Sequence, residues 1–179
     1  AATTVLTKGT ANQVLTSDGT DISWAAAGSS GKVLQVVTTQ TGTHASGTTT
    51  VPIDNTIMQI TEGDEYMSLA ITPTSATSRL FIQVQALLSS SALGFITGSI
   101  FQDTTAGALA TSLAMQTDAV RQPRVLPLNH NMVAGTTSAT TFKFRAGLQI
   151  SNTTYFNGTA SQLWGGVGAS SITITEYTP

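Results

Sequence analysis

The stretch R-L-F-I-Q-V-Q-A-L, Arg79–Leu87, decides the fold class because its side chains alternate between apolar and mostly polar types. Its even-numbered residues are all apolar, whereas Arg79 and two glutamines lie among the odd-numbered ones. This period of two is typical of a β-strand in a sheet with one covered face. Similar alternation at Thr141–Ile150 and Ser171–Tyr177 predicts further strands that share a buried interior.

More short strands are expected around these three, separated by turns rich in Gly, Pro, Ser and Thr. They are Val33–Val37, Thr56–Ile60, Tyr66–Thr72 and Phe95–Gln102. The composition of Ala106–Met115 suits a helix, but its context favours a strand or loop. Two prolines limit Arg124–Leu126 to an edge strand or a loop. About eight to ten short strands predict an all-β domain, either a sandwich or a barrel.

A separate hairpin is predicted near the start of the chain, in G-T-A-N-Q-V-L-T-S-D-G-T-D-I-S-W-A-A-A-G, residues 9–28. Its Asp-Gly pair lies between two short apolar runs, and glycine accepts the positive φ that a tight turn needs. A two-stranded hairpin alone is marginally stable in water, so Leu15, Ile22 and Trp24 require a cover. This requirement predicts a repeated or threefold assembly.

The composition excludes several classes of function. Only 9% of the 179 residues are charged and the net charge is −2, against about a quarter charged in ordinary soluble proteins. The chain therefore has no basic face for nucleic acid and no polybasic cluster for an anionic membrane. About 50 residues are Ser or Thr, and threonine suits pleated sheets. Because few charges protect the strand edges, we expect the chain to form oligomers.

The chain has no cysteine, which excludes disulfides and thiolate-bound metals and fits assembly in a reducing cytosol. It has no apolar run of about 18 residues, so no membrane insertion is expected. The start, A-A-T-T-V-L-T-K-G, has neither an initiator methionine nor the regions of a signal peptide. We therefore expect the chain to be the C-terminal part of a longer protein.

No catalytic site or cofactor is predicted. His44 and His130 lie far apart in polar contexts without a nucleophile motif, and both are expected to be loop histidines. A glycosidase needs two facing carboxylates. The candidate acids, none within a recognisable motif, are Asp54, Glu62, Asp64, Asp103 and Asp118.

Two short motifs have simple structural interpretations. Glu62–Glu65 could offer oxygens to Ca²⁺, but a charged turn explains it better, so no metal site is predicted. Gly165–Gly168 lacks the Lys-Ser/Thr of a phosphate-binding loop, so it is expected to be a bend or bulge between strands.

Aromatic residues near the C-terminus are the candidates for recognition. Tyr155, Asn157 and Trp164 lie in a loop-rich region, where rings can stack on sugars or anchor a protein interface. Tyr155 and Asn157 are expected to be exposed, whereas core packing is the favoured alternative for Phe156 and Trp164. Four basic residues could bind an acidic glycan, but a solvated face or salt bridges between subunits is favoured. They are Arg121, Arg124, Lys143 and Arg145.

Several of these stretches resemble bacteriophage fibre proteins. G-T-A-N-Q-V-L-T-S-D-G-T-D-I-S-W-A resembles the GTxGQVLTSNG…W module of tail-fibre and related adhesion proteins, with Asn12 in place of the usual glycine. In that family the module lies in or beside a fibrous shaft, just before a globular head. The stretches TPTSATSRLFIQVQA, AGTTSATTFKFRAG and ASSITITEY resemble, in order, three motifs of a C-terminal domain common in phage fibres.

The resemblance implies a homotrimeric jelly-roll head at residues 31–179, of the tumour-necrosis-factor and complement C1q type. Residues 1–30 would be the end of the shaft and a linker, with Leu15, Ile22 and Trp24 in contact between the three chains. The protein would be part of a tail or head fibre of the virion, assembled in the cytoplasm of the bacterial host. Other virion proteins would contact the preceding part of the chain.

The function that the resemblance implies is attachment without catalysis. The fibre would recognise a host-surface polysaccharide or protein, and several weak sites would act together by avidity. A structural virion protein, as a capsid decoration or tail-assembly connector, is the first alternative. A polysaccharide depolymerase is the second.

Overall fold

The computed structural model describes residues 6–28, 31–117 and 119–179. Ser29-Ser30 of the expected linker and the candidate acid Asp118 lie outside the described residues. The elements are β1 (Gln13–Ser17), β2 (Ile22–Ala26), β3 (Val33–Thr41), β4 (Ala45–Gly47), β5 (Asp64–Ile71), β6 (Arg79–Ser90), β7 (Gly94–Gln102), β8 (Ala110–Gln116), β9 (Arg124–Val133), β10 (Thr140–Leu148), β11 (Thr154–Phe156), the short 3₁₀ helix η1 (Trp164–Gly166) and β12 (Ser170–Tyr177). No described helix is long and apolar enough to cross a membrane.

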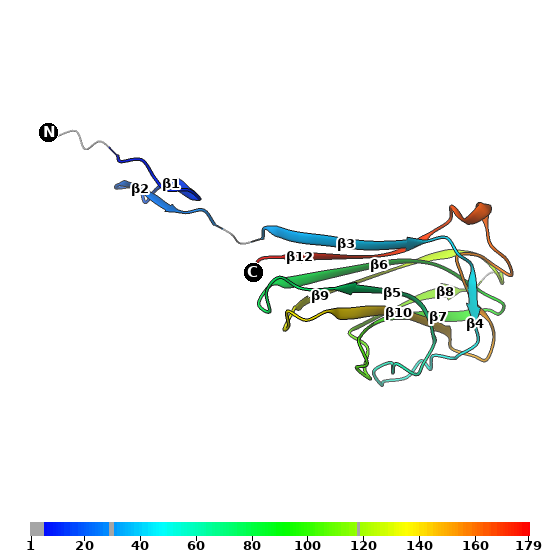
Figure 1. Cartoon of the computed structure of the whole chain (residues 1–179). Coiled ribbons are helices and arrows are strands. Elements are labelled where there is room, and N and C mark those ends of the chain that lie inside the picture. Colours follow the sequence, from blue (N-terminus) through cyan, green and yellow to red (C-terminus); the bar gives the residue numbers. More distant parts are fainter. Residues whose placement is uncertain (1–5, 29–30, 118) are drawn as a thin grey trace.

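Two antiparallel sheets built from eight longer strands form a sandwich (Figure 1). The larger sheet contains β3, β12, β6 and β9 in that order, and the smaller one contains β5, β10, β7 and β8. Numbered along the chain, the eight strands follow the orders 1-8-3-6 and 2-7-4-5, which is the jelly-roll arrangement. The short strands β11 and β4 continue the larger sheet beside the end of β6. The predicted all-β jelly-roll sandwich is therefore confirmed.

The core lies between the two sheets and follows the alternation of the sequence. On β6, Leu80, Ile82 and Val84 are at most 2% exposed, and Phe142 and Phe144 of β10 are fully buried. Each large apolar side chain that is removed from water in this way contributes about 1.5–3 kcal/mol. Apart from Thr56–Ile60, the strands expected around these residues are present, and most of the ambiguous segment Ala106–Met115 belongs to the strand β8.

The prediction of a strand at Thr56–Ile60 is wrong. These residues belong to the long connection between β4 and β5, where Gln59 makes a single bridge to Gly107. The connection packs over the outer face of the smaller sheet, and its Val51 and Met58 form a second small core with Phe101 of β7. Its apolar residues therefore cover a sheet instead of extending one. We name residues 51–62 of this connection the covering loop.

The segment between the two prolines is an edge strand, as one of the two alternatives predicted. It is the beginning of β9, which is longer than expected and pairs with β6 along its whole length. Pro127 lies inside β9, opposite Gln85. An edge strand tolerates proline because one side of the strand has no neighbour that needs the missing N–H.

The N-terminal hairpin forms as predicted, with β1 and β2 joined by a turn in which Gly19 has φ +90°. The preceding segment folds back over Trp24, whose indole N–H donates to the Thr7 carbonyl at 2.6 Å. A Cβ on Gly9 would lie 2.6 Å from the Trp24 ring, so only glycine fits there. Asn12 has φ +64°, in the left-handed region that favours glycine and tolerates asparagine. This conformation explains why asparagine can stand where the resembling module has glycine.

A buried carboxylate holds the last strand to the β5–β6 connection. Glu176 of β12 is fully buried, and it accepts hydrogen bonds from the Thr74 amide and hydroxyl, both at 2.8 Å. The Ser78 hydroxyl donates to the same oxygen, and the Gln35 amide donates to the other one at 2.6 Å. Burial acts to raise the pKa of Glu176, but these hydrogen bonds outweigh it and lower the pKa to about 2.

Candidate functional site

The three predicted recognition residues lie in three different environments. Tyr155 is half-buried on β11, where its ring stacks on His44 with the ring centres 6.1 Å apart. Phe156, the next residue, is buried in the core and stacks on Tyr66 at 5.1 Å. The core alternative therefore holds for Phe156, whereas Tyr155, which is expected to be exposed, is half-buried.

The prediction that Asn157 is exposed is wrong. Asn157 is fully buried with φ +54°, and its side-chain amide donates to the Thr41 carbonyl at 2.7 Å and the Thr43 carbonyl at 3.2 Å. Its side-chain oxygen accepts from the Ser170 hydroxyl at 2.6 Å. Asn157 thus links the segment after β11 to the end of β3, to the β3–β4 connection and to the start of β12. Its side chain has no surface with which to contact a receptor.

Trp164 is exposed, so the core alternative for this residue is wrong. It begins η1 with φ +48°, and 64% of its surface is accessible. The ring lies on Gly168, where a Cβ would come within 2.6 Å of it. Beside it, Leu87 and Val125 line a shallow pocket of about 300 Å³, and Val167 is 83% exposed. We name Leu87, Val125, Trp164 and Val167 the distal patch.

The distal patch lies at one end of the sandwich. In Figure 1, η1 is at the end opposite to that where β3 begins and the chain continues toward the N-terminal hairpin. Gly165–Gly168, expected to be a bend or bulge between strands, lies in the turn that contains η1 and leads into β12, with φ +62° at Gly165 and +90° at Gly166.

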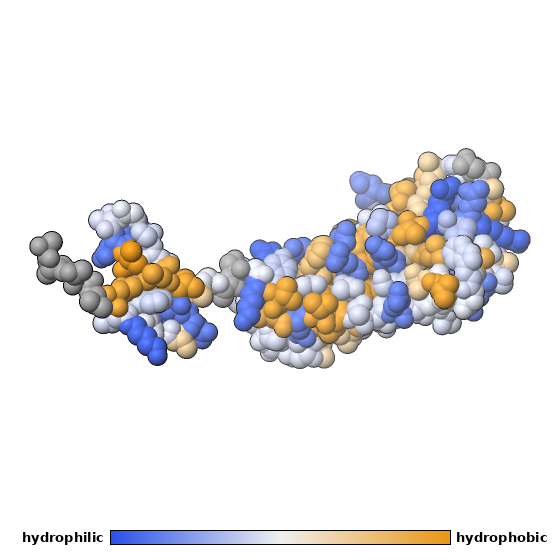
Figure 2. All heavy atoms as spheres, turned by 90° about the horizontal axis from the view of Figure 1, so that it is seen from above, coloured by the Kyte–Doolittle hydropathy of each residue, from blue (hydrophilic) through white to orange (hydrophobic). Residues whose placement is uncertain are grey.

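The hairpin carries a second exposed apolar surface. Leu15 lies opposite Trp24, and Ile22 lies on the same face as both. Leu6, Leu15 and Ile22 are 43%, 52% and 51% exposed, and Trp24 is 37% exposed. Figure 2 shows these apolar residues gathered on the hairpin. Leu15, Ile22 and Trp24, which are expected to need a cover, therefore remain partly exposed in a single chain.

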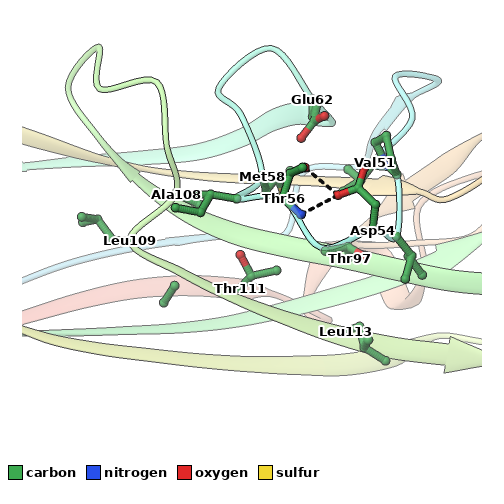
Figure 3. A pocket seen from close by; sticks show the side chains of 14 residues that line it. Val51, Asp54, Thr56, Met58, Glu62, Thr97, Ala108, Leu109, Thr111 and Leu113 are labelled. Atoms are coloured by element: carbon green, nitrogen blue, oxygen red, sulfur yellow. Dashed lines mark hydrogen bonds between the residues drawn. The ribbon is translucent and has the colours of Figure 1, made fainter.

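Sequence reasoning missed a pocket between the covering loop and β8 (Figure 3). It has a volume of about 380 Å³, and mostly aliphatic side chains line it, with Asp54, Glu62 and three threonines. Thr97 of β7 is 6% exposed, and its hydroxyl has no hydrogen-bond partner. The signal was the sequence of β7, F-I-T-G-S-I-F. Its apolar residues lie on both faces, as in a strand covered on both sides.

The candidate acids serve local structure. Their hydrogen-bond donors are Thr56 for Asp54, Gln59 for Glu62, Thr49 for Asp64, and Thr140 and Thr141 for Asp103. Glu65 forms ion pairs with Lys143 at 3.6 Å and Arg145 at 3.5 Å. Among the described residues, no three His, Cys, Asp or Glu side chains gather as a metal site would require.

The histidines and basic residues are also separated. His44 lies in the β3–β4 connection and contacts the Thr159 carbonyl at 3.0 Å. His130 lies within β9, so its prediction as a loop histidine is wrong, and burial lowers its pKa. Of the four candidate basic residues, Lys143 and Arg145 belong to β10 of the smaller sheet, whereas Arg124 belongs to β9 of the larger one.

Replacing Gly147 with alanine is expected to lower the free energy of unfolding by about 1–3 kcal/mol, because overpacking forces the backbone to shift. A Cβ there would lie 2.4 Å from the Thr49 carbonyl oxygen and 2.9 Å from the Val51 side chain, just where the connection turns onto the smaller sheet. Urea unfolding measures the change. Gly28→Ala is the matched control, since no atom lies within 4 Å of its added Cβ. Equal stability of the two variants would contradict this account of the connection.

Comparisons with known proteins give only distant likenesses. No protein-family model matches the chain, and no curated protein matches it. Among solved structures, an infectious bursal disease virus Gx strain structure is similar with a TM-score of 0.41 and 14% identity, over 89% of this chain and 35% of that one. The VP2 subviral particle of the same virus gives a TM-score of 0.35 and 10% identity, over 90% of this chain and 41% of that one. The structure of the Gt strain of this virus gives a TM-score of 0.37 and 12% identity, over 93% of this chain and 42% of that one.

This chain therefore spans about two fifths or less of the viral chains to which it is similar. All three TM-scores are below 0.5, so nothing about the function of this chain follows from them.

Proposed function

We propose that this chain is part of a virion fibre, a homotrimer that attaches a bacteriophage to a polysaccharide on the host surface. The proposal rests on the resemblance of the hairpin and of three strand motifs to phage fibre sequences. The observation that carries the attachment role is Trp164, 64% exposed at the end of the sandwich away from the hairpin.

The distal patch suits recognition of a sugar face. An exposed indole ring offers a flat apolar surface, and such rings are frequent anchors in interfaces. Its position is fixed by the backbone of η1 and by Gly168, so little conformational freedom is lost when a ligand stacks on it. Gln85 lies in the same shallow pocket and can hydrogen-bond a sugar hydroxyl.

Weak binding at one site is sufficient in a fibre. Three identical heads bring three copies of the distal patch to one surface, and linked sites raise the overall affinity without any new contact. The hairpin supplies the link in this proposal, because Leu15, Ile22 and Trp24 would cover one another across three chains. No step of attachment needs a cofactor or a catalytic residue.

A structural virion protein is the second candidate. The same exposed Trp164 and Val167 would then bury against another virion protein instead of a glycan. This role makes a different prediction, because the chain would bind a virion component tightly and would not bind host cells.

The test is binding of the whole chain to host cells and to purified surface polysaccharide. Trp164→Ala is expected to reduce binding by about 10- to 100-fold, the range for loss of a central aromatic anchor. Val36→Ala is the control, since Val36 is 56% exposed on β3 of the larger sheet, toward the end opposite to the distal patch. Equal binding by both variants would overturn the role of the distal patch, and cleavage of the polysaccharide would favour a depolymerase.

A further inference from the structure

We propose that the pocket between the covering loop and β8 binds a small ligand that carries a protonated primary amine on a short aliphatic body. The site is separate from the distal patch and from the hairpin, and it does not depend on the attachment role. Its walls, its charge and one buried hydroxyl carry the inference (Figure 3).

The walls of the pocket are aliphatic and partly open to solvent. Ile53 and Ile57 on one side are 51% and 65% exposed, and Leu113 of β8 on the other side is 53% exposed. A ligand that covers them removes apolar surface from water, which favours binding in proportion to the area covered. No aromatic ring lines the pocket, so its walls suit an alkyl chain better than the face of a sugar.

The residues that line the pocket carry a net negative charge. Its only ionisable lining residues are Asp54 and Glu62, and neither takes part in an ion pair within the described part of the chain. One oxygen of Asp54 accepts from Thr56, and these hydrogen bonds hold its pKa below the usual range. The nearby Arg145 donates to the Glu62 and Gly63 carbonyls and pairs with Glu65.

The free oxygens of the two carboxylates therefore offer acceptors to a cation. An ammonium group has three N–H donors and no acceptor, which matches a site of this kind. An anionic ligand would be repelled by both carboxylates.

The buried hydroxyl of Thr97 is the second, independent indication of a ligand. Thr97 belongs to the lining of the pocket, and its oxygen lacks a partner although the residue is only 6% exposed. A buried polar atom without a hydrogen bond is unfavourable, so such atoms are rare in folded proteins. An ammonium N–H entering between the walls would supply the missing partner.

The test compares three five-carbon ligands on the whole chain by NMR titration: pentylammonium, pentanol and pentanoate. Pentylammonium is expected to bind in the millimolar range and to shift the signals of residues 51–62 and 108–113. Pentanol is expected to bind about tenfold more weakly, because it contacts the aliphatic walls but has no positive charge to attract the carboxylates. Binding of pentanoate as tight as that of pentylammonium, or amine-induced shifts scattered over the surface, would overturn the proposal.

Variants of the chain test whether the amine binds at this pocket or is attracted to acidic residues in general. Asp54→Asn with Glu62→Gln is expected to weaken pentylammonium binding about tenfold, whereas Asp21→Asn, an exposed acid of the hairpin, is expected to leave it unchanged. Thr97→Val keeps the side-chain shape and is expected to weaken binding as well. Should a pocket variant fail to fold, Leu113→Arg on the exposed face of β8 gives the same test by placing a competing cation at the pocket.

Two sources of the amine can be told apart in the same titration. Cadaverine represents a free diamine, and Nα-acetyl-lysine methylamide represents a lysine carried by a peptide. Binding of either compound that is tighter than that of pentylammonium supports the site and identifies the source of the amine. The proposal would be overturned if none of the three amines bound at about 20 mM, a concentration a few-fold above the expected millimolar dissociation constant.

Discussion

Replacing Glu176 with glutamine is expected to lower the free energy of unfolding by about 2–3 kcal/mol at neutral pH. The carboxylate accepts hydrogen bonds from Thr74, Ser78 and Gln35 in a fully buried position. A glutamine amide has one acceptor oxygen instead of two, so its NH₂ group would face the Gln35 donor. The partly buried Gln35 amide would lose one of its two acceptors and keep only the Thr72 carbonyl, and the remaining hydrogen bonds would lose the assistance of the negative charge.

The pH dependence of stability gives a second readout of the same residue. The pKa of Glu176 is lowered from 4.5 to about 2 in the folded chain. A carboxyl whose pKa is depressed by folding stabilises the fold above its unfolded pKa, and this contribution is lost as the pH falls through the folded value. The native chain should therefore lose stability between pH 4.5 and about 2, and Glu176→Gln should lack this part of the loss.

Urea unfolding at several pH values measures both effects. Glu65→Gln is the control, because Glu65 is a partly exposed carboxylate whose ion pairs are worth little. Ser78→Ala should reproduce part of the loss at neutral pH, since it removes one donor to Glu176. A Glu176→Gln variant as stable as Glu65→Gln at neutral pH would contradict the role of the buried cluster.

The cluster also explains two sequence motifs that were compared separately with phage fibres. The Thr-Pro-Thr-Ser segment before β6 and the glutamate of the last strand are about a hundred residues apart, yet they form one hydrogen-bonded unit. The alternation in the last strand puts Ile172 and Ile174 on one face, and this face is buried. The same alternation puts Glu176 inside, but only the structure shows the donors that make a buried charge tolerable.

Predictions from the local sequence pattern were wrong at positions where tertiary contacts determine the structure. The apolar spacing of Thr56–Ile60 suits a strand, but this segment covers Phe101 from outside the sheet. Asn157 was expected at the surface because asparagine is usually exposed. Instead, its amide donates to the carbonyls of Thr41, at the end of β3, and Thr43, in the β3–β4 connection, and no short-range signal in the sequence indicates those partners.

The candidate binding surfaces were predictable to different degrees. Trp164 was a candidate for recognition, but core packing was the favoured alternative, and only the structure shows that 64% of its surface is exposed. The pocket could not be predicted, because the covering loop, β7 and β8 come together only when the sandwich has formed. The unpaired hydroxyl of Thr97 is likewise a property of the packed structure.

Replacing Leu15 with aspartate is expected to convert a trimer of the chain into monomers. The proposed trimer buries Leu15, Ile22 and Trp24 of three hairpins against one another, and these residues are 37–52% exposed in one chain. Threefold contact would bring three aspartates close together in an apolar environment, and burying unpaired like charges is strongly unfavourable.

Light scattering over a dilution series measures the outcome. The parent chain should have about three times the 18.5 kDa mass of one copy, and the Leu15→Asp variant should have the mass of one copy. Thr16→Asp is the matched control, because Thr16 lies on the opposite face of the same strand and an aspartate there would stay in water. A variant that remains trimeric would place the subunit contacts on the sandwich, whereas a monomeric parent would overturn the trimer itself.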